Sequence, residues 1–245
     1  MMNIVLSDNS IFKEAFESIS AIIDEIVCIV DSEGFRVTAM DRSHISFVSL
    51  DLKPELFDEF DIPTPEKITL DTSELMKILK RMKKQDVLHL SCDEGNFIIG
   101  LKGDMDREFK IRLIDVEYES PQPPHIDYPV HVTDIPSELV KEAITDMALF
   151  GEKLNIRIDE DYMRIVSEGE FGDAEWKYIH GCDVGEFVEA CFAIDKLVDM
   201  FKASKFSKDL NVSLGTDMPL TLNFELPAGE GRISFLLAPR LNQDE

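Results

Sequence analysis

Apolar and polar residues alternate over many short runs of this chain, and alternation at every second position predicts half-buried β-strands. In the first half the runs cover residues 35–41, 44–52, 87–93, 97–103 and 109–115. In the second half they cover residues 162–168, 175–181, 210–216, 220–226 and 232–238. Each run is short enough for one strand, so the pattern predicts antiparallel sheets with one covered face.

The period changes at "LMKILKRMKK", residues 75–84. At about 100° per residue, one face carries only apolar side chains, from Leu75, Ile78, Leu79 and Met82. The opposite face is cationic, with Lys77, Lys80, Arg81 and Lys84. The segment therefore predicts an amphipathic helix, capped at its start by Asp71, Thr72 or Ser73. An ordinary solvated helix face and a surface for anions both fit this pattern.

An internal repeat decides the architecture. "KEAFESI" (residues 13–19) resembles "KEAITDM" (141–147), and residues 73–91 resemble residues 195–213 in the same order. Each half then reads helix, strands, helix, strands, over roughly 115 residues. We predict an α+β protein of two similar domains, residues 1–117 and 131–245, joined by residues 118–130. That connector holds Pro121, Pro123, Pro124 and Pro129, so we expect it to be extended and on the surface.

Composition narrows the function. Hydrophobic residues make up 44% of the 245 residues and charged residues 30%, as in a globular protein. The net charge of -24 argues against nucleic acid unless the basic residues gather on one surface. No apolar run approaches the ~20 residues of a membrane span, and the N-terminus lacks a secretion signal, so we expect no membrane partner. The four cysteines form no CxxC pair, which favours free thiols in a reducing compartment.

Catalytic and metal motifs are missing from the sequence. There is no GxGxxG, GxxxxGK[ST] or HExxH, and the five histidines show no ligand spacing with the cysteines. The acidic stretch near Asp159 lacks the central glycine of a calcium loop, and Met163 occupies a ligand position. Acidic pairs such as Asp58 and Glu59 are expected by chance among this many carboxylates. We therefore predict no enzyme, no catalytic residues, no metal and no cofactor.

Four segments together resemble the proliferating cell nuclear antigen family of DNA sliding clamps. They are "MDRSHISFVSLDL" (residues 40–52), "SELMKILKRMK" (73–83), "KIRLIDVE" (110–117) and "FLLAPRLNQDE" (235–245). The resemblance covers the whole chain, and the tail and connector are most similar to archaeal members. It implies a ring-shaped homotrimer with helices lining a hole around duplex DNA, sheets outside and no catalysis. The residues alone leave one alternative open, an acidic interaction scaffold that does not encircle DNA.

The resemblance also implies which residues face DNA without reading its sequence. Clamps carry basic residues on all inner helices, which here gives Lys13, Lys77, Lys80, Arg81, Lys84, Lys141, Lys196, Lys202 and Lys205. Glu14, Thr145 and Asp195 stand where relatives have basic residues. We therefore expect the helix with Lys77 to dominate DNA contact, because an uneven band concentrates the attraction for phosphates there.

A pocket for partner peptides is implied beneath the connector, beside the C-terminal strand. By residue type and position its lining would be Met40, His44, Ile45, Phe47, Pro219, Leu237, Ala238 and Pro239. The connector carries prolines where relatives often present leucine or isoleucine, which leaves Pro121, Pro123 and Ile126 as open candidates for its wall. The implied partners are the clamp loader (replication factor C), the replicative DNA polymerase, flap endonuclease and DNA ligase.

Subunits of such a ring join edge to edge. The resemblance implies that residues 108–114 of one chain pair antiparallel with residues 175–181 of the next. The contact would involve Phe109, Lys110, Ile111, Met147, Phe150, Trp176 and Tyr178. Such a clamp would work in the cytoplasm of an archaeal cell, or in the nucleus of a eukaryotic one.

Overall fold

The computed structural model describes residues 2–93, 95–115 and 120–241. By compactness the chain divides into two units. Unit 1 comprises Met1–Asp41, Val48–Pro123 and Glu225–Ile233, and unit 2 comprises Arg42–Phe47, Pro124–Phe224 and Ser234–Glu245. The segment Arg42–Phe47 thus belongs with the second half of the chain, although it comes from the first. The domain bounds 1–117, 118–130 and 131–245 stay a prediction, and the boundary at 117 and 118 lies outside the described residues.

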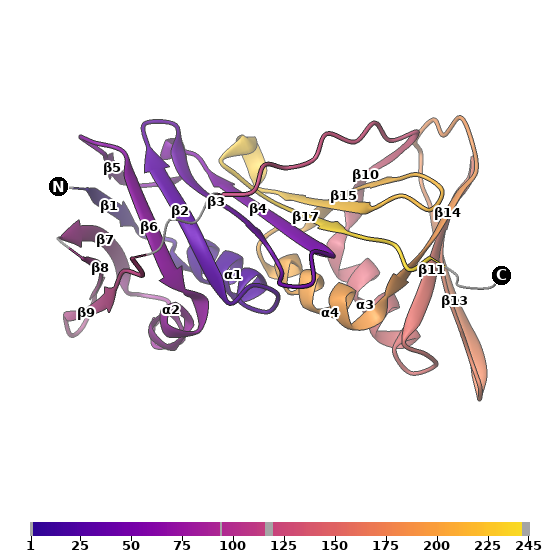
Figure 1. The fold of residues 1–245 in the computed structure, drawn as a ribbon, viewed down its shortest axis with the longest axis horizontal. Helices are drawn as coiled ribbons and strands as arrows, with labels where there is room; N and C mark the ends of the chain where they lie inside the picture. The colour runs from indigo at the N-terminus through magenta and orange to yellow at the C-terminus, as the bar shows by residue number, and fades with distance from the viewer. Residues whose placement is uncertain (1, 94, 116–119, 242–245) are drawn as a thin grey trace. The chain divides into compact units, whose positions relative to one another are not determined.

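Unit 1 is built from two sheets and two helices (Figure 1). One sheet has the order β5-β1-β7-β8-β9, and in the other β6, β2, β3 and β4 are neighbours in that order. The strands are β1 (Asn3–Leu6), β2 (Glu25–Asp31), β3 (Gly34–Met40), β4 (Ser46–Leu52), β5 (Glu59–Asp61), β6 (Glu66–Asp71), β7 (Val87–Asp93), β8 (Asn96–Lys102) and β9 (Arg107–Arg112). The helices are α1 (Asn9–Ile19) and α2 (Thr72–Leu79), with a 3-10 turn η1 at Pro54–Leu56.

Unit 2 repeats the plan, again with two sheets and two helices. One sheet has the order β13-β12-β11-β14, and in the other β10, β15, β16 and β17 are neighbours in that order. The strands are β10 (Val130–Pro136), β11 (Lys153–Ile158), β12 (Tyr162–Gly169), β13 (Gly172–Ile179), β14 (Val188–Ala193), β15 (Asp209–Leu214), β16 (Leu220–Glu225) and β17 (Gly231–Leu237). The helices are α3 (Ser137–Met147) and α4 (Ile194–Met200), with a 3-10 turn η2 at Phe201–Lys205. The 3-10 turn η3 (Pro227–Gly229) and the start of β17 fall in the span Glu225–Ile233, which belongs to unit 1.

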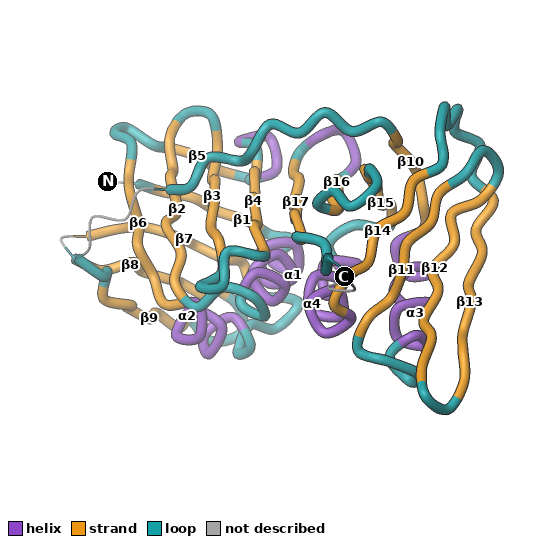
Figure 2. The backbone as a smooth tube through the Cα atoms, turned by 45° about the vertical axis from the view of Figure 1, so that its right-hand side comes forward, coloured by secondary structure: helices purple, strands orange, loops and turns teal. Residues whose placement is uncertain are grey.

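The helices of each unit lie side by side, α1 with α2 and α3 with α4 (Figure 2). On α1 the buried residues Phe12, Ala15, Phe16 and Ile19 follow the i, i+3, i+4, i+7 spacing of one helix face. On α3 four buried positions follow the same spacing from Val140 to Met147. The predicted α+β class with two similar halves is confirmed.

Aromatic side chains fill the core of each unit. In unit 1 the Phe12 ring lies 4.5 Å from that of Phe16 and 5.5 Å from that of Phe35, edge-on to the latter. In unit 2 Phe224 lies edge-on to Phe201 at 5.6 Å. Each buried phenylalanine stabilises the fold by about 1.5–3 kcal/mol relative to an exposed one, so these clusters hold helices against sheets.

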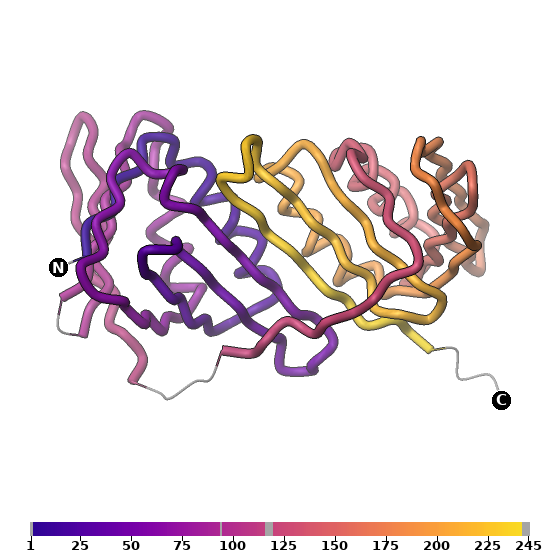
Figure 3. The backbone as a smooth tube through the Cα atoms, turned by 90° about the horizontal axis from the view of Figure 1, so that it is seen from above, coloured from indigo at the N-terminus to yellow at the C-terminus, as the bar shows by residue number. Residues whose placement is uncertain are grey.

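The connector is extended, as its prolines predict. Residues 120–128 form neither helix nor strand, and Figure 3 shows them as a drawn-out tube. Its end is attached within unit 2, where the Tyr128 hydroxyl lies 2.7 Å from the Thr221 hydroxyl. Among the described residues, no helix is long and apolar enough to cross a membrane.

Candidate functional site

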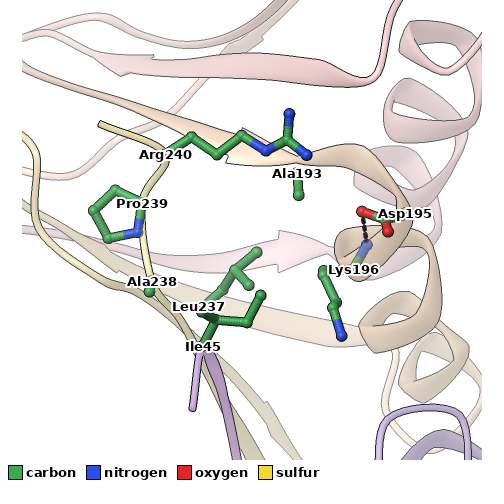
Figure 4. Close-up of a pocket in the computed structure, with 8 residues that line it drawn as sticks. All are labelled: Ile45, Ala193, Asp195, Lys196, Leu237, Ala238, Pro239 and Arg240. Atoms are coloured by element: carbon green, nitrogen blue, oxygen red, sulfur yellow. Dashed lines mark hydrogen bonds between the residues drawn. The ribbon is translucent and has the colours of Figure 1, made fainter. Parts of the chain in front are cut away.

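A small cavity lies where the C-terminal segment passes α4 in unit 2 (Figure 4). Its volume is about 140 Å³. Its lining combines apolar side chains with a charged rim: Ile45, Ala193, Asp195, Lys196, Leu237, Ala238, Pro239 and Arg240. Three separate stretches of chain thus meet around one hollow.

Backbone hydrogen bonds hold the C-terminal segment at this place. The Ala238 N–H donates to the carbonyl of Ile45 at 2.8 Å, and the Arg240 N–H donates to the carbonyl of Cys191 at 2.7 Å. Beyond β17 the chain therefore continues in an ordered, extended path up to Arg240. Ile45 is 39% exposed and Leu237 is 1% exposed, so one apolar side chain faces solvent while the other anchors the wall.

The cavity brings together four of the eight residues expected for a peptide pocket, namely Ile45, Leu237, Ala238 and Pro239. His44, Phe47 and Pro219 belong to the same unit but not to its lining. Phe47 is 3% exposed, although strand alternation puts it on the face of β4 that carries the half-buried Ser49 and Asp51. Met40 belongs to unit 1 and is 36% exposed.

Sequence reasoning missed the other half of the lining. Ala193 ends β14 and Asp195 lies in the first turn of α4, where its carboxylate accepts a hydrogen bond from the Lys196 N–H at 2.8 Å (Figure 4). Lys196, which was expected to face DNA, also lines this cavity, and its role at DNA stays a prediction. The signal available was the position of Arg240 directly after "LLAP", a charge next to an apolar wall.

The basic segment after β6 begins as predicted and ends earlier. Asp71 is the N-cap of α2, since its carboxylate accepts hydrogen bonds from the N–H groups of Ser73 at 2.8 Å and Glu74 at 3.1 Å. The Ser73 hydroxyl also donates to this carboxylate. This hydrogen bond first, and then the two from N–H groups, hold the pKa of the Asp71 carboxyl below its ordinary value. The helix stops at Leu79, so the expectation of a helix over residues 75–84 is wrong.

A turn of residues 80–86, called the basic turn below, takes over from the helix. It carries four exposed cations: Lys80, Arg81, Lys83 and Lys84. Met82 between them is 7% exposed and remains on the core side, as its apolar character predicts. Within the described residues, no carboxylate pairs with the side chains of Lys80, Arg81 or Lys84.

The other candidate DNA-facing lysines differ, since several have acidic partners on their own helix. Lys77 pairs with Glu74 at 2.5 Å, and this contact raises the pKa of the Lys77 ammonium. Lys141 pairs with Glu138 at 3.1 Å, and Lys202 pairs with Asp199 at 2.7 Å. Lys13 is half-buried on α1, and Lys205 is exposed at the end of η2. The cations without a nearby carboxylate therefore concentrate in the basic turn.

Strands β9 and β13 each lie at the end of their sheet, as the sheet orders give them (Figure 1). On β9, Phe109 is half-buried and Ile111 is 8% exposed, while Lys110 lies 3.4 Å from Asp93. On β13, the rings of Trp176 and Tyr178 stack with centroids 5.8 Å apart. Both strands thus present one backbone edge without a neighbour among the described strands.

The helix end beside β13 gives a mixed result for the predicted interface. Phe150 is 37% exposed, but Met147 is 2% exposed. The expected contribution of Met147 to a contact between chains is therefore wrong, because the periodicity of α3 directs it into its own unit. Leu149 and Phe171 are 77% and 94% exposed and were not anticipated.

The cysteines are all free thiols, as the sequence predicts. Burial raises the pKa of Cys28 well above its ordinary value and that of Cys92 to about 12, so neither is a thiolate near neutral pH. In the part of the chain that the structure describes, no group of three or more histidine, cysteine or acidic side chains is arranged to hold a metal ion.

Two similar halves, each with paired helices and two antiparallel sheets, define the fold of a sliding clamp. Family models agree, since the one for the proliferating cell nuclear antigen N-terminal domain matches residues 1–120 and the one for its C-terminal domain matches residues 123–240. The chain belongs to the proliferating cell nuclear antigen family.

Individual relatives point the same way. The DNA polymerase sliding clamp of Methanobrevibacter smithii is 49% identical over 245 residues, and that of Methanothermobacter thermautotrophicus is 46% identical, each over 100% of both chains. The proliferating cell nuclear antigen of Entamoeba histolytica has the same fold, with a TM-score of 0.91, 22% identity and coverage of 98% and 99% of the two chains. The prediction of a DNA polymerase sliding clamp is therefore confirmed over the acidic interaction scaffold.

Proposed function

We propose that three copies of this chain close into a ring around duplex DNA and hold a replicative polymerase to it. The observation that carries the proposal is the pair of unpartnered sheet edges, β9 in unit 1 and β13 in unit 2. Exposed edges invite uncontrolled pairing unless each has a designated partner, and head-to-tail closure gives every β9 a β13 of the next chain. The pairing covers these two edges, whereas β5, β6, β10 and β14 still end their sheets.

Charge and apolar contact support this pairing. Outside its apolar positions, β9 carries Arg107, Lys110 and Arg112 against one acid, Glu108, whereas β13 carries Asp173 and Glu175 against Lys177. Antiparallel pairing thus sets a cationic strand beside an acidic one. Phe109 on β9 and Phe150 beside β13 offer apolar surface to the contact.

The ring needs only weak attraction to DNA, because closure prevents escape. An overall charge of -24 keeps wrong contacts away, while cations on the helices attract phosphates irrespective of sequence. Lys80, Arg81 and Lys84 are the strongest candidates, since no carboxylate described here neutralises them. Lys13, Lys77, Lys141, Lys202 and Lys205 are secondary candidates. Lys196 is a weaker candidate for DNA contact, because it lines the cavity.

Partner proteins dock at the cavity near Ala238. An apolar hollow bounded by an extended chain suits a peptide of the form Q-x-x-hydrophobic-x-x-aromatic-aromatic, because backbone groups can add strand-like hydrogen bonds. The same site serves polymerase, flap endonuclease and DNA ligase, and replication factor C opens the ring. Because its relatives are archaeal, we expect the clamp to work in the cytoplasm. It needs no catalytic group or cofactor.

Size-exclusion chromatography with light scattering tests the assembly. The expected mass is about three times the 27.9 kDa of one chain. A strict monomer at micromolar concentration would count against the ring. A trimer that slides off linear DNA but stays on circular DNA after loading supports encirclement, whereas equal retention on both forms supports a surface-bound scaffold.

A further inference from the structure

The basic turn poses a physical problem. Four cations in the five residues 80–84 repel one another, and α2 has ended before them. Such a segment is expected to move freely unless something holds it, and a mobile loop loses conformational entropy on binding an anion. The structure nevertheless gives the turn a defined path, with backbone hydrogen bonds from Arg81 to Ile78 at 2.8 Å and from Asp86 to Lys83 at 3.0 Å.

A buried carboxylate stands at the end of the turn. Asp86 is 2% exposed, and its carboxylate accepts a hydrogen bond from the Lys83 N–H at 2.8 Å. An acid in this position is costly unless it is paired. Its partner is Arg107 of β9, which donates to the same carboxylate and is itself 21% exposed at the side chain.

Arg107 also reaches the other end of the turn. Its Nη1 donates to the backbone carbonyl of Arg81 at 2.9 Å, while its Nη2 contacts Asp86. One rigid guanidinium thus bridges the beginning and the end of the basic turn. A lysine has a single ammonium on a flexible stem and cannot reproduce this fork.

Two further residues, Asn9 and Gly103, help Asp86 and Arg107 to hold the basic turn, and the four are called the clasp below. The side-chain amide of Asn9, at the start of α1, donates to the carbonyl of Lys83 at 2.9 Å and to that of Asp86. Gly103 leaves room for the acid, since a Cβ there would lie 2.5 Å from an oxygen of the Asp86 carboxylate. Three elements distant in sequence therefore converge on one short turn.

The second half of the repeat lacks this device. Matching residues 73–91 with residues 195–213 sets Lys208 against Asp86, and Lys208 is exposed. The corresponding segment is the 3-10 turn η2, followed by a hydrogen bond from the Ser137 hydroxyl to the Ser207 carbonyl at 2.7 Å. The buried acid is thus specific to the turn with the most unpaired cations.

We propose that Arg107, together with Asp86, is a positioning residue that presents the basic turn to DNA phosphates. The proposal rests on the proposed function, in which the turn faces the duplex. Because Arg107 lies on β9, the strand expected to pair with the next subunit, the same side chain connects the subunit edge to the DNA surface. Arg107 need not touch DNA to act in this way.

The test measures the affinity of the full-length clamp for a short duplex by fluorescence anisotropy, from about 50 to about 200 mM KCl. Each phosphate contact contributes about 0.9 to the slope of log affinity against log salt. We expect Arg107→Met to flatten the slope by about 1 to 2 units. Arg112→Met is the matched control, since it removes the same charge from the other end of β9 and should leave more of the slope intact.

A second background separates positioning from direct contact. In a clamp that carries Lys80→Ala, Arg81→Ala and Lys84→Ala, Arg107→Met should cause no further change. Equal flattening by Arg107→Met in both backgrounds would mean that Arg107 contacts DNA or acts through net charge, and would overturn the proposal. An unchanged slope for Arg107→Met alone, with a flattened slope for the triple variant, overturns the positioning role and leaves the DNA surface in place. An unchanged slope for the triple variant overturns the proposed DNA surface itself.

Hydrogen exchange reports on the turn without DNA. Arg107→Met should accelerate exchange of the Lys83 amide, and unchanged protection would contradict the clasp. Light scattering and circular dichroism establish that each variant is a folded trimer. Should Arg107→Met fail to fold, Arg107→Lys carries the test, because it keeps the charge and loses one arm of the fork. An intermediate slope is then expected, and a wild-type slope together with wild-type exchange overturns the proposal.

Discussion

Placing a carboxylate in the cavity of unit 2 should abolish partner binding while sparing the fold. Ala238→Asp is the sharpest change, because Ala238 lines the cavity and the hydrogen bond to Ile45 uses only its backbone. Ile45→Asp is a second change on the neighbouring segment, at a residue that is 39% exposed. Neither side chain is a major part of the core, so the melting temperature should change little.

The magnitude follows from what the peptide loses. One large apolar anchor buried in such a hollow contributes about 1.5–3 kcal/mol. Losing it lowers affinity roughly 10- to 150-fold. The new carboxylate must also be desolvated without a partner, which brings Ala238→Asp toward the upper end of that range. The double variant should bind below the detection limit of calorimetry.

Isothermal titration calorimetry with a peptide of the form Q-x-x-hydrophobic-x-x-aromatic-aromatic decides the matter. Ala228→Asp is the control, since Ala228 is an exposed alanine of unit 1 with a φ of 59°, a conformation that aspartate tolerates. One peptide per subunit should bind to this control as to the wild type. Unchanged affinity in the double variant would show that the peptide docks elsewhere.

Three further predictions concern the edges, the cations and the helix cap. Phe109→Ala should shift ring dissociation to higher protein concentration, as light scattering on dilution would show, and a variant that stays trimeric at nanomolar concentration would exclude this contact. Replacing four cationic residues with alanine should leave folding and trimerisation intact but reduce polymerase processivity, increasingly as salt rises: Lys77, Lys80, Arg81 and Lys84. Equal processivity of wild type and variant across a salt series would contradict this prediction. Asp71→Ala should lower the free energy of unfolding by about 1 kcal/mol at neutral pH, while Asp71→Asn preserves the cap. Because the pKa of Asp71 is lowered from 3.8, the cap contributes fully above that value and less as the pH falls through the lowered pKa, so denaturant unfolding of wild type and Asp71→Ala should converge in acid.

How far the sequence predicts the fold depends on the range of the interactions. Alternation and the internal repeat predicted the strands, the paired helices and the α+β class, because these follow from local periodicity and from burial of one face. The end of α2 was not predictable in this way. Its apolar period continues to Met82, but Asp86 binds the nearby Lys83 N–H in a turn, and Arg107 binds the Arg81 carbonyl. Arg107 becomes a neighbour of Arg81 only in the folded chain.

The candidate sites show the same division. Ile45 and Ala238 were foreseen together only through resemblance to a family, since nothing in their local sequence links them. The burial of Met147 was visible in principle, as it follows Val140, Ala143 and Ile144 at helical spacing. Asp195 and Arg240 were not assigned to the cavity, because a charge beside an apolar wall carries no periodic signal.

The membership of Arg42–Phe47 in unit 2 has a consequence for an interrupted chain. A fragment that begins at Pro124 contains both helices of unit 2 and the whole C-terminal segment, yet it lacks Ile45 and the carbonyl to which Ala238 is bonded. After a break in the connector, one wall of the cavity would therefore depend on a non-covalently held piece of the other fragment. If partners dock at this cavity, as proposed above, a clamp cut in the connector should lose them once its two fragments separate.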